Sequence, residues 1–182
     1  IQGVEFSITD YDLRVDAIKE VPGVVLAMPQ IVGQVMATSG GISGGAVVRG
    51  VRGEDLAARN VISENIVMGS LSAFARGEGV MIGVRMAERF GLGLGDEITL
   101  ISPKGNVTAF GTAPRLKDYP IIAMFDVGMS DFDSSIIYMP LSLAQVYFKY
   151  PGSVTAIEVQ VEDPDQARLA QDAQVMRDCW LR

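Results

Sequence analysis

The segment GVMIGVRMAERFGLGLGDEITL, residues 79–100, decides the fold prediction because it joins a helical pattern to a strand pattern through one glycine-rich turn. Ile82, Met86 and Phe90 recur at helical spacing and predict a helix over about residues 80–90. The glycines of 91–95 end that helix and lead into a strand predicted over 97–101. This segment favours a fold in which helices pack on a sheet.

On the N-terminal side, the sequence predicts a helix and then a β-hairpin. Thr9 and Asp12 form a capping pattern for a helix that Pro22 and Gly23 end. The buried face of this helix is predicted to hold Leu13, Ala17 and Val21. Strands are predicted over 24–37 and 46–51, with the glycine-rich connection 39–45 between them and a short polar helix over 52–60.

On the C-terminal side, strands and helices continue to alternate. Pro140 suits the start of a helix that runs to about Phe148, and Asp163-Pro164 begins a last helix. Further strands are predicted over 107–110, 121–127, 135–139 and 157–161. We therefore predict an α+β fold with mixed sheets, packed helices and two lobes. One lobe is expected to be discontinuous, from about 1–75 and 150–182, and the other to comprise about 76–149.

Composition excludes several classes of function. The net charge is −7 with only 15 Lys and Arg, which argues against a nucleic-acid partner because a polyanion needs a basic face. The absence of histidine and the single Cys179 remove Cys/His zinc sites and Ser-His-Asp catalysis, and no cofactor is expected. No run approaches the ~20 apolar residues that span a bilayer. The chain begins and ends abruptly, so we expect it to be a piece of a longer protein.

Two glycine-rich runs and one acidic cluster invite interpretation as sites. Residues 40–45 lack the Lys and Ser/Thr of a phosphate-binding loop, and the glycines of 91–95 close a helix where a dinucleotide site would open one. Asp126, Asp131 and Asp133 surround Gly128. A solvated turn is one interpretation of this cluster, and calcium binding or carboxylate-based hydrolysis is the alternative.

A loop of about residues 108–120 is expected to project between two apolar strands. Pro114, Leu116 and Tyr119 are predicted at its tip beside two cations, Arg115 and Lys117. Exposed apolar and aromatic groups next to arginine are typical of protein-binding hot spots. The alternative is an ordinary long hairpin whose apolar residues fold back on the domain.

The same residues carry a resemblance to a known family. The segments 79–87 and 91–100 resemble the extracytoplasmic domains of MacB-like permeases. The following segments are similar to the LolC/LolE family of lipoprotein-releasing permease subunits: TAFGTAPRLK (108–117), FDVGM (125–129), DFDS (131–134) and IYM (137–139). Residues 18–24 and 47–51 fit the same family, so the resemblance covers nearly the whole chain.

The resemblance implies a MacB-like periplasmic core domain, without catalytic activity, in a permease that spans the bacterial inner membrane. Such a permease would act with a second permease subunit, as a hetero- or homodimer, and with a cytosolic ATPase. It would release lipoproteins to the periplasmic carrier LolA, which a hook loop and a neighbouring pad would bind. The hook positions implied here are Phe110, Gly111, Thr112, Ala113, Pro114, Arg115, Leu116, Lys117, Asp118 and Tyr119.

This chain departs from the family pattern at one point, because family hooks often carry a further basic residue near Thr112 or Asp118. The resemblance leaves open LolC, LolE or a single subunit that serves both roles. It also leaves open a related MacB-like export permease, whose periplasmic domain would contact an adaptor or a substrate.

Overall fold

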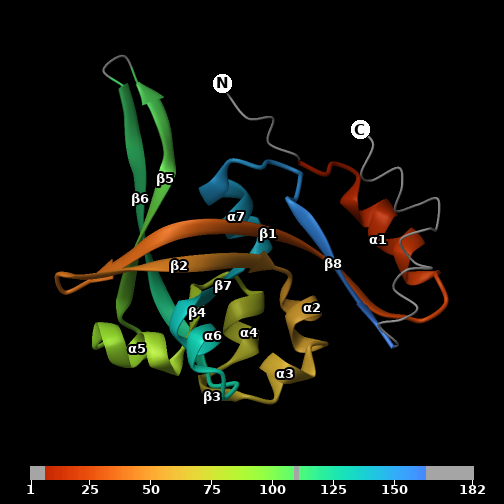
Figure 1. Cartoon of the computed structure of the whole chain (residues 1–182), viewed down its shortest axis with the longest axis horizontal. Helices are drawn as coiled ribbons and strands as arrows, with labels where there is room; N and C mark the ends of the chain where they lie inside the picture. The colour runs from red at the N-terminus through yellow and green to blue at the C-terminus, as the bar shows by residue number, and fades with distance from the viewer. Residues whose placement is uncertain (1–6, 109–110, 163–182) are drawn as a thin grey trace. The chain divides into compact units, whose positions relative to one another are not determined.

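The computed structural model describes residues 7–108 and 111–162 (Figure 1). The chain divides into two compact units: unit 1 is Ile1–Gln30 with Tyr150–Arg182, and unit 2 is Ile31–Lys149. Residues 31–75, which the sequence-based division assigned to the discontinuous lobe, belong to unit 2. The reason is that the hairpin that begins there pairs with strands from the middle of the chain. The predicted helix from Asp163 lies outside the described residues.

Unit 1 contains helix α1 (Tyr11–Lys19) and an antiparallel strand pair. The first part of β1 (Val24–Ser39) pairs with β8 (Ala156–Val161), with Ala27 opposite Val159. Val15, Ile18 and Ala27 form the buried cluster of this unit.

The predicted buried face of α1 is wrong, because Leu13 is 73% exposed. Leu13 and Ala17 lie about 200° around the helix from Val15. The sequence contains two apolar stripes on this helix, and the β-branched stripe of Val15 and Ile18 is the one that is buried. The N-cap is Asp10, without a side-chain capping hydrogen bond, so the predicted capping pattern does not begin this helix.

Unit 2 begins with the hairpin of β1 and β2 (Ile42–Val51). Its ladder continues to Ser39 opposite Ile42, so most of the glycine-rich segment 39–45 is strand. The turn is Gly40-Gly41, with φ of 55° and 85°. Two successive positive φ angles suit the tight turns that match strand twist, and glycine adopts them without a steric penalty. The predicted hairpin is confirmed, with a shorter connection.

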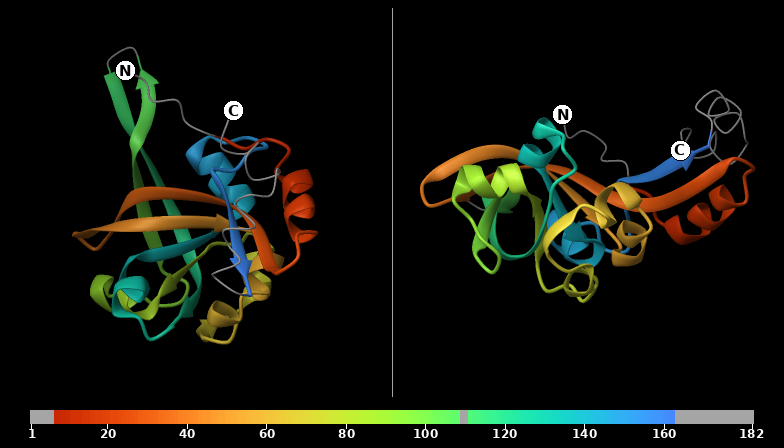
Figure 2. Two further views of the ribbon diagram at one scale, coloured as in Figure 1. Left: turned by 45° about the vertical axis from the view of Figure 1, so that its right-hand side comes forward. Right: turned by 90° about the horizontal axis from the view of Figure 1, so that it is seen from below.

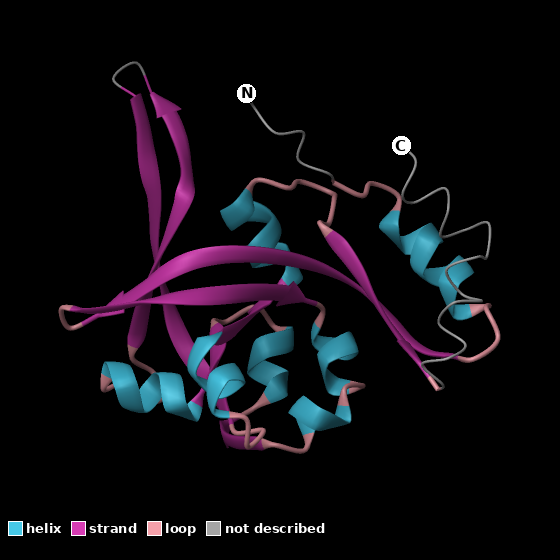
Figure 3. Ribbon diagram, viewed as in Figure 1, coloured by secondary structure: helices cyan, strands magenta, loops and turns pink. Residues whose placement is uncertain are grey.

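Six strands of unit 2 pair in a closed circuit, which we call the ring. From β1 and β2 it continues through β7 (Ile136–Pro140), β4 (Val80–Gly83), β6 (Gly111–Phe125) and β5 (Glu97–Thr108), and β5 returns to β1. The β2–β7 and β4–β6 pairs are parallel and the others antiparallel. A seventh strand, β3 (Ile66–Gly69), pairs with β6 outside the ring. The mixed sheet with interleaved helices confirms the α+β class (Figure 3).

The helix predicted over 80–90 is a strand followed by a shorter helix. Residues 80–83 form β4, which is fully buried and pairs with β6 on one side and β7 on the other. Helix α5 is Val84–Phe90, and it ends at Gly91 in the left-handed conformation, as the sequence predicted. Four consecutive buried residues match either helix or strand, and here partners distant in sequence select the strand.

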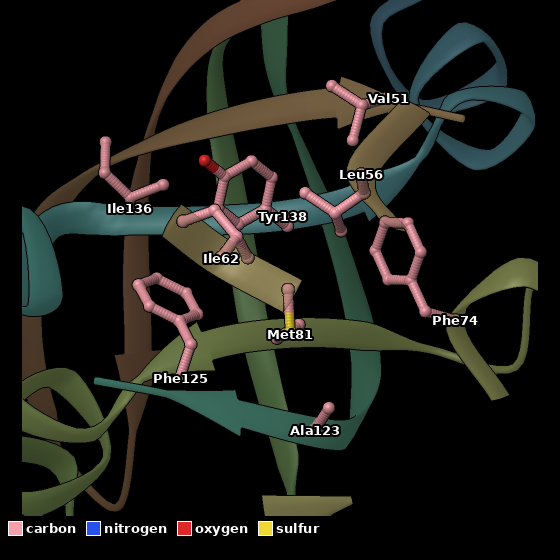
Figure 4. Close-up of a cluster of buried hydrophobic side chains, with 9 residues drawn as sticks. All are labelled: Val51, Leu56, Ile62, Phe74, Met81, Ala123, Phe125, Ile136 and Tyr138. Carbon is pink, nitrogen blue, oxygen red and sulfur yellow. The ribbon is translucent and has the colours of Figure 1, made fainter. Parts of the chain in front are cut away.

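Four short helices cover one face of the ring around an aromatic cluster (Figure 4). They are α2 (Gly53–Ala57), α3 (Asn60–Ser63), α4 (Leu71–Ala75) and α6 (Ser130–Ser135). Phe125 makes edge-to-face ring contacts to Phe132 at 5.9 Å and to Tyr138 at 5.6 Å. Such pairs add to the stabilisation that burial of the rings already provides.

Helix α7 (Leu141–Phe148) packs on the other face of the β1–β2 hairpin. Val51 contacts the aromatic cluster, whereas Gly50 points the opposite way and faces α7. A Cβ added at Gly50 would lie 2.2 Å from the Cβ of Ala144, and one at Gly33 would lie 2.3 Å from the ring of Phe148. The two glycines therefore let α7 approach the hairpin closely.

Candidate functional site

The predicted projecting loop is a β-hairpin. β5 and β6 pair from Glu97 opposite Pro120 to Ser102 opposite Arg115, and again from Asn106 opposite Ala113 to Thr108 opposite Gly111. The ring ends near Ile101, the last residue of β5 that pairs with β1. Beyond it the hairpin continues away from the rest of unit 2 (Figures 1 and 2). We call this continuation, Ser102–Thr108 with Gly111–Arg115, the arm.

The ladder of the arm is interrupted just beyond the ring. Between the Ser102–Arg115 pair and the Asn106–Ala113 pair, residues 103–105 face only Pro114. Pro103 and Pro114 have no backbone N–H to donate, so neither can extend the ladder here. Residues 108–120 were predicted as a loop between two apolar strands, but β5 and β6 continue into this segment and pair on both sides of the break.

The ten predicted hook residues do not form one surface. Phe110 lies outside the described residues, and Gly111, Thr112 and Ala113 pair in the distal ladder of the arm. Leu116 is 62% exposed, and Pro114, Lys117 and Asp118 are exposed as well. Tyr119, expected at the tip, is 3% exposed and lies within the ring opposite Ile98. Alternation along β6 places Tyr119 on the face opposite Leu116 and Asp118, since neighbouring residues of a strand face opposite sides.

An apolar row crosses three strands beside the base of the arm. Leu116 pairs with Ile101, and Ile101 pairs with Met36 of β1, so the three side chains share one face of the sheet. Met36 is 45% exposed, and Leu116 more so. Met36 and Ile101 were not predicted as part of the site. Only the strand register brings them beside Leu116, and no local pattern reveals that register.

A cluster of Arg115, Tyr119 and Tyr147 lies on the opposite face, where the arm leaves the ring. Arg115 Nη1 donates to the carbonyl oxygen of Tyr147 in the last turn of α7, and its guanidinium carbon lies 5.8 Å from the centre of the Tyr147 ring. The rings of Tyr119 and Tyr147 meet edge to face at 5.9 Å. Arg115 is thus held by the body of unit 2 and is not a free cation at a loop tip.

Burial controls the ionisation of both tyrosines. It raises the pKa of Tyr147 to about 12, against the opposing effect of the Arg115 charge. Burial also raises the pKa of Tyr119, with a smaller contribution from Tyr147 and the same opposition from Arg115. Both phenols therefore remain neutral at physiological pH. The ammonium group of Lys117 lies 5.1 Å from the centre of the Tyr119 ring, a cation–π distance.

Two carboxylates of the acidic cluster accept hydrogen bonds from backbone N–H groups of the turn after β6. Asp126 Oδ1 accepts from the N–H of Gly128 at 3.0 Å, and Asp133 Oδ1 accepts from the N–H of Val127 at 3.1 Å. Asp131 lies in the first turn of α6. A shallow depression of about 600 Å³ adjoins this turn and is lined by Met129, Ser130, Asp131, Phe132, Ser135 and Ile136. Within residues 7–108 and 111–162, no three or more Asp, Glu, Cys or His side chains lie close enough together to hold a metal ion.

The fold and the arm together define an α+β domain with a protruding β-hairpin. The chain belongs to the MacB-like periplasmic core domain family, whose model matches residues 2–174. This assignment places it among domains on the periplasmic side of the inner membrane. Within the described ranges, no helix is both long and apolar enough to cross a membrane.

Curated relatives and solved structures agree with this family. The chain is 27% identical over 148 residues to the lipoprotein-releasing system transmembrane protein LolC of Neisseria meningitidis serogroup B, which covers 80% of the chain and 35% of the relative. It is 24% identical over 123 residues to LolC of Xylella fastidiosa, which covers 67% of the chain and 30% of the relative. The chain thus spans about a third of the length of these relatives.

Two solved structures share the fold. The extracellular domain of the ABC-type transporter YknZ from Gram-positive bacteria superposes with a TM-score of 0.61 at 18% identity, over 94% of this chain and 83% of that one. The periplasmic region of MacB from Actinobacillus actinomycetemcomitans superposes with a TM-score of 0.56 at 12% identity, over 94% of this chain and 72% of that one.

Proposed function

We propose that this chain is the periplasmic domain of a lipoprotein-releasing ABC transporter permease, and that its arm docks the soluble lipoprotein carrier LolA. Two curated relatives named LolC support the transport role. The observation that carries the docking role is the arm itself, a strand pair that continues beyond the ring with exposed apolar side chains at its base. On this proposal the domain catalyses no reaction. The ATPase, a second permease subunit and the lipoprotein substrate belong to the full complex.

Leu116 is the side chain at the base of the arm best placed to contact a carrier, and Lys117 follows it on the other face of β6. Leu116 offers an apolar group that loses water on docking, and Ile101 and Met36 extend the apolar surface beside it. Lys117 is an exposed cation on a protein of net charge −7, so its charge can steer the approach of a partner from the face of β6 opposite Leu116. A carrier must also leave after receiving its cargo. A small interface with roughly micromolar affinity would allow that release.

The experiment measures binding of purified LolA from the same organism to this chain by calorimetry. The test variant is Leu116→Ser with Lys117→Ser, which spares Arg115 and so leaves the contact with α7 in place. The matched control is Leu94→Ser, another exposed leucine of unit 2, which lies before β5 at the end away from the arm. We expect the double variant to weaken binding roughly tenfold or more and the control to bind like the wild type.

Failure of the wild-type chain to bind LolA would refute carrier docking and leave the family membership intact. A related export permease, whose periplasmic domain contacts an adaptor or a substrate, would then be the better explanation. The solved MacB and YknZ domains, which share this fold at low identity, favour that second candidate.

A further inference from the structure

Arg115 occupies the last pair of the ladder before the interruption in the arm. Its partner Ser102 is buried, and the next residues outward, 103–105 and Pro114, do not pair in register. A strand pair can bend at such a break, because the backbone hydrogen bonds that join the two strands are missing there. The Ser102–Arg115 pair is the last paired position before this break, so the orientation of this pair sets the direction in which the arm leaves the ring.

The contact that holds this pair comes from α7. Arg115 donates to the Tyr147 carbonyl, one of the last helix carbonyls, which have no partner within the helix. A cation at a helix C-terminus is also favoured by the helix dipole. The helix ends at Lys149, whose φ of 61° is the left-handed conformation. Tyr147 is itself fixed by ring contacts with Tyr119 and with Phe148, the latter at 4.8 Å.

We infer that Arg115 is a positioning residue: it fastens the exit of the arm to the C-terminal end of α7 and so sets the direction in which the arm leaves the ring. This inference rests on the proposed docking function for its biological purpose, but its structural content is independent of any partner. An arm held in one direction loses less conformational freedom on docking than one that swings at its base. The contribution of Arg115 to binding is then indirect.

The test measures the orientation of the arm in the absence of a partner. Spin labels are placed at Thr112→Cys on β6 and Glu88→Cys on α5, both in unit 2, with Cys179 replaced by Ser, and their distance distribution is recorded by pulsed electron resonance. Arg115→Ala should broaden or shift the distribution. Arg115→Lys should give an intermediate result, because lysine can donate to the same carbonyl but lacks the planar guanidinium. Lys117→Ala, two residues along the same strand, should leave the distribution unchanged.

Carrier binding provides the second readout. Arg115→Ala should weaken LolA binding roughly three- to tenfold, the loss expected when one more mobile element must be ordered on association. An unchanged distance distribution in a folded Arg115→Ala variant would overturn the inference, even if binding fell, because Arg115 would then act as a direct contact. Circular dichroism establishes that each variant is folded, and Arg115→Lys still tests the inference if Arg115→Ala does not fold. If the wild type does not bind LolA, the docking proposal fails, and the distance measurement still decides the role of Arg115.

Discussion

Substitution of Gly50 tests the close packing of α7 on the ring. In Gly50→Ala the new Cβ would lie 2.2 Å from the Cβ of Ala144, whereas non-bonded carbons settle at about 3.5–4.0 Å. Strand and helix must therefore separate locally by more than about 1 Å. Overpacking of this kind costs about 1–3 kcal/mol, and both partners here are close to the backbone and cannot rotate away. We expect a loss of about 3 kcal/mol, or roughly 6–12 °C in Tm.

A control variant and a compensating double variant test the same contact between β2 and α7. Gly45→Ala, on the same strand, meets nothing within 4 Å and should be neutral or slightly stabilising. Ala144→Gly alone should cost about 1 kcal/mol through helix propensity. The double variant Gly50→Ala with Ala144→Gly removes one of the two colliding methyl groups. Its loss should be smaller than the sum of the single losses by at least about 2 kcal/mol.

The assay is urea unfolding followed by circular dichroism, with the four variants compared at constant m-value. Strict additivity of the two single substitutions would refute the packing argument, because independent sites add and colliding ones do not. A Gly50→Ala variant as stable as Gly45→Ala would refute it more directly, since α7 would then lie farther from the hairpin in solution.

Three further predictions concern the core, the tyrosines and the acidic turn. Phe125→Ala, in the aromatic cluster, should cost about 3–5 kcal/mol in urea unfolding because the ring is fully buried, and a loss below about 1 kcal/mol would contradict the packing described. Because the pKa of Tyr147 is raised to about 12, its contribution to stability is complete below pH ~10 and is lost as pH rises towards 12. The raised pKa of Tyr119 likewise lowers stability as pH rises. The free energy of unfolding of Tyr147→Phe should therefore fall less steeply with pH in this range than that of the wild type. An unchanged alkaline transition would argue against burial of the Tyr147 phenol. Asp133→Ala should cost about 1–3 kcal/mol because the Val127 N–H loses its acceptor. Calcium should leave the wild-type melting temperature unchanged, and a clear rise would revive the metal-binding alternative.

Local signals in the sequence were sufficient to predict turns and helix ends that glycine or proline determines. The glycine-rich segment 39–45 predicted a connection between β1 and β2, within which the turn is Gly40-Gly41, and Gly91 predicted the end of α5, because glycine adopts positive φ more readily than other residues. Pro140 predicted the start of α7 to within one residue. These features depend on a few adjacent residues, so a single sequence is enough to find them.

Features set by distant partners were not predictable in this way. β4 is a strand because β6 and β7 pair with it, and the apolar spacing of its residues fits a helix equally well. At the candidate site, the projecting hairpin was foreseen, but Tyr119 and Arg115 were expected at its tip. Their contacts with α7 involve a residue 28 to 32 positions away, and the register of β5 against β6 decides which side chains face α7.

The closed circuit of the ring has a consequence for the evolution of the arm. Every strand of the ring pairs on both sides, and the arm begins only where β5 and β6 pass beyond that circuit. A hairpin that grows or shrinks by one residue on each strand keeps its register and alternation. The arm can therefore change length in paired steps, or be exchanged for another hairpin, while the closed body keeps its own hydrogen bonds. The length of the arm is thus independent of the hydrogen bonds that close the ring.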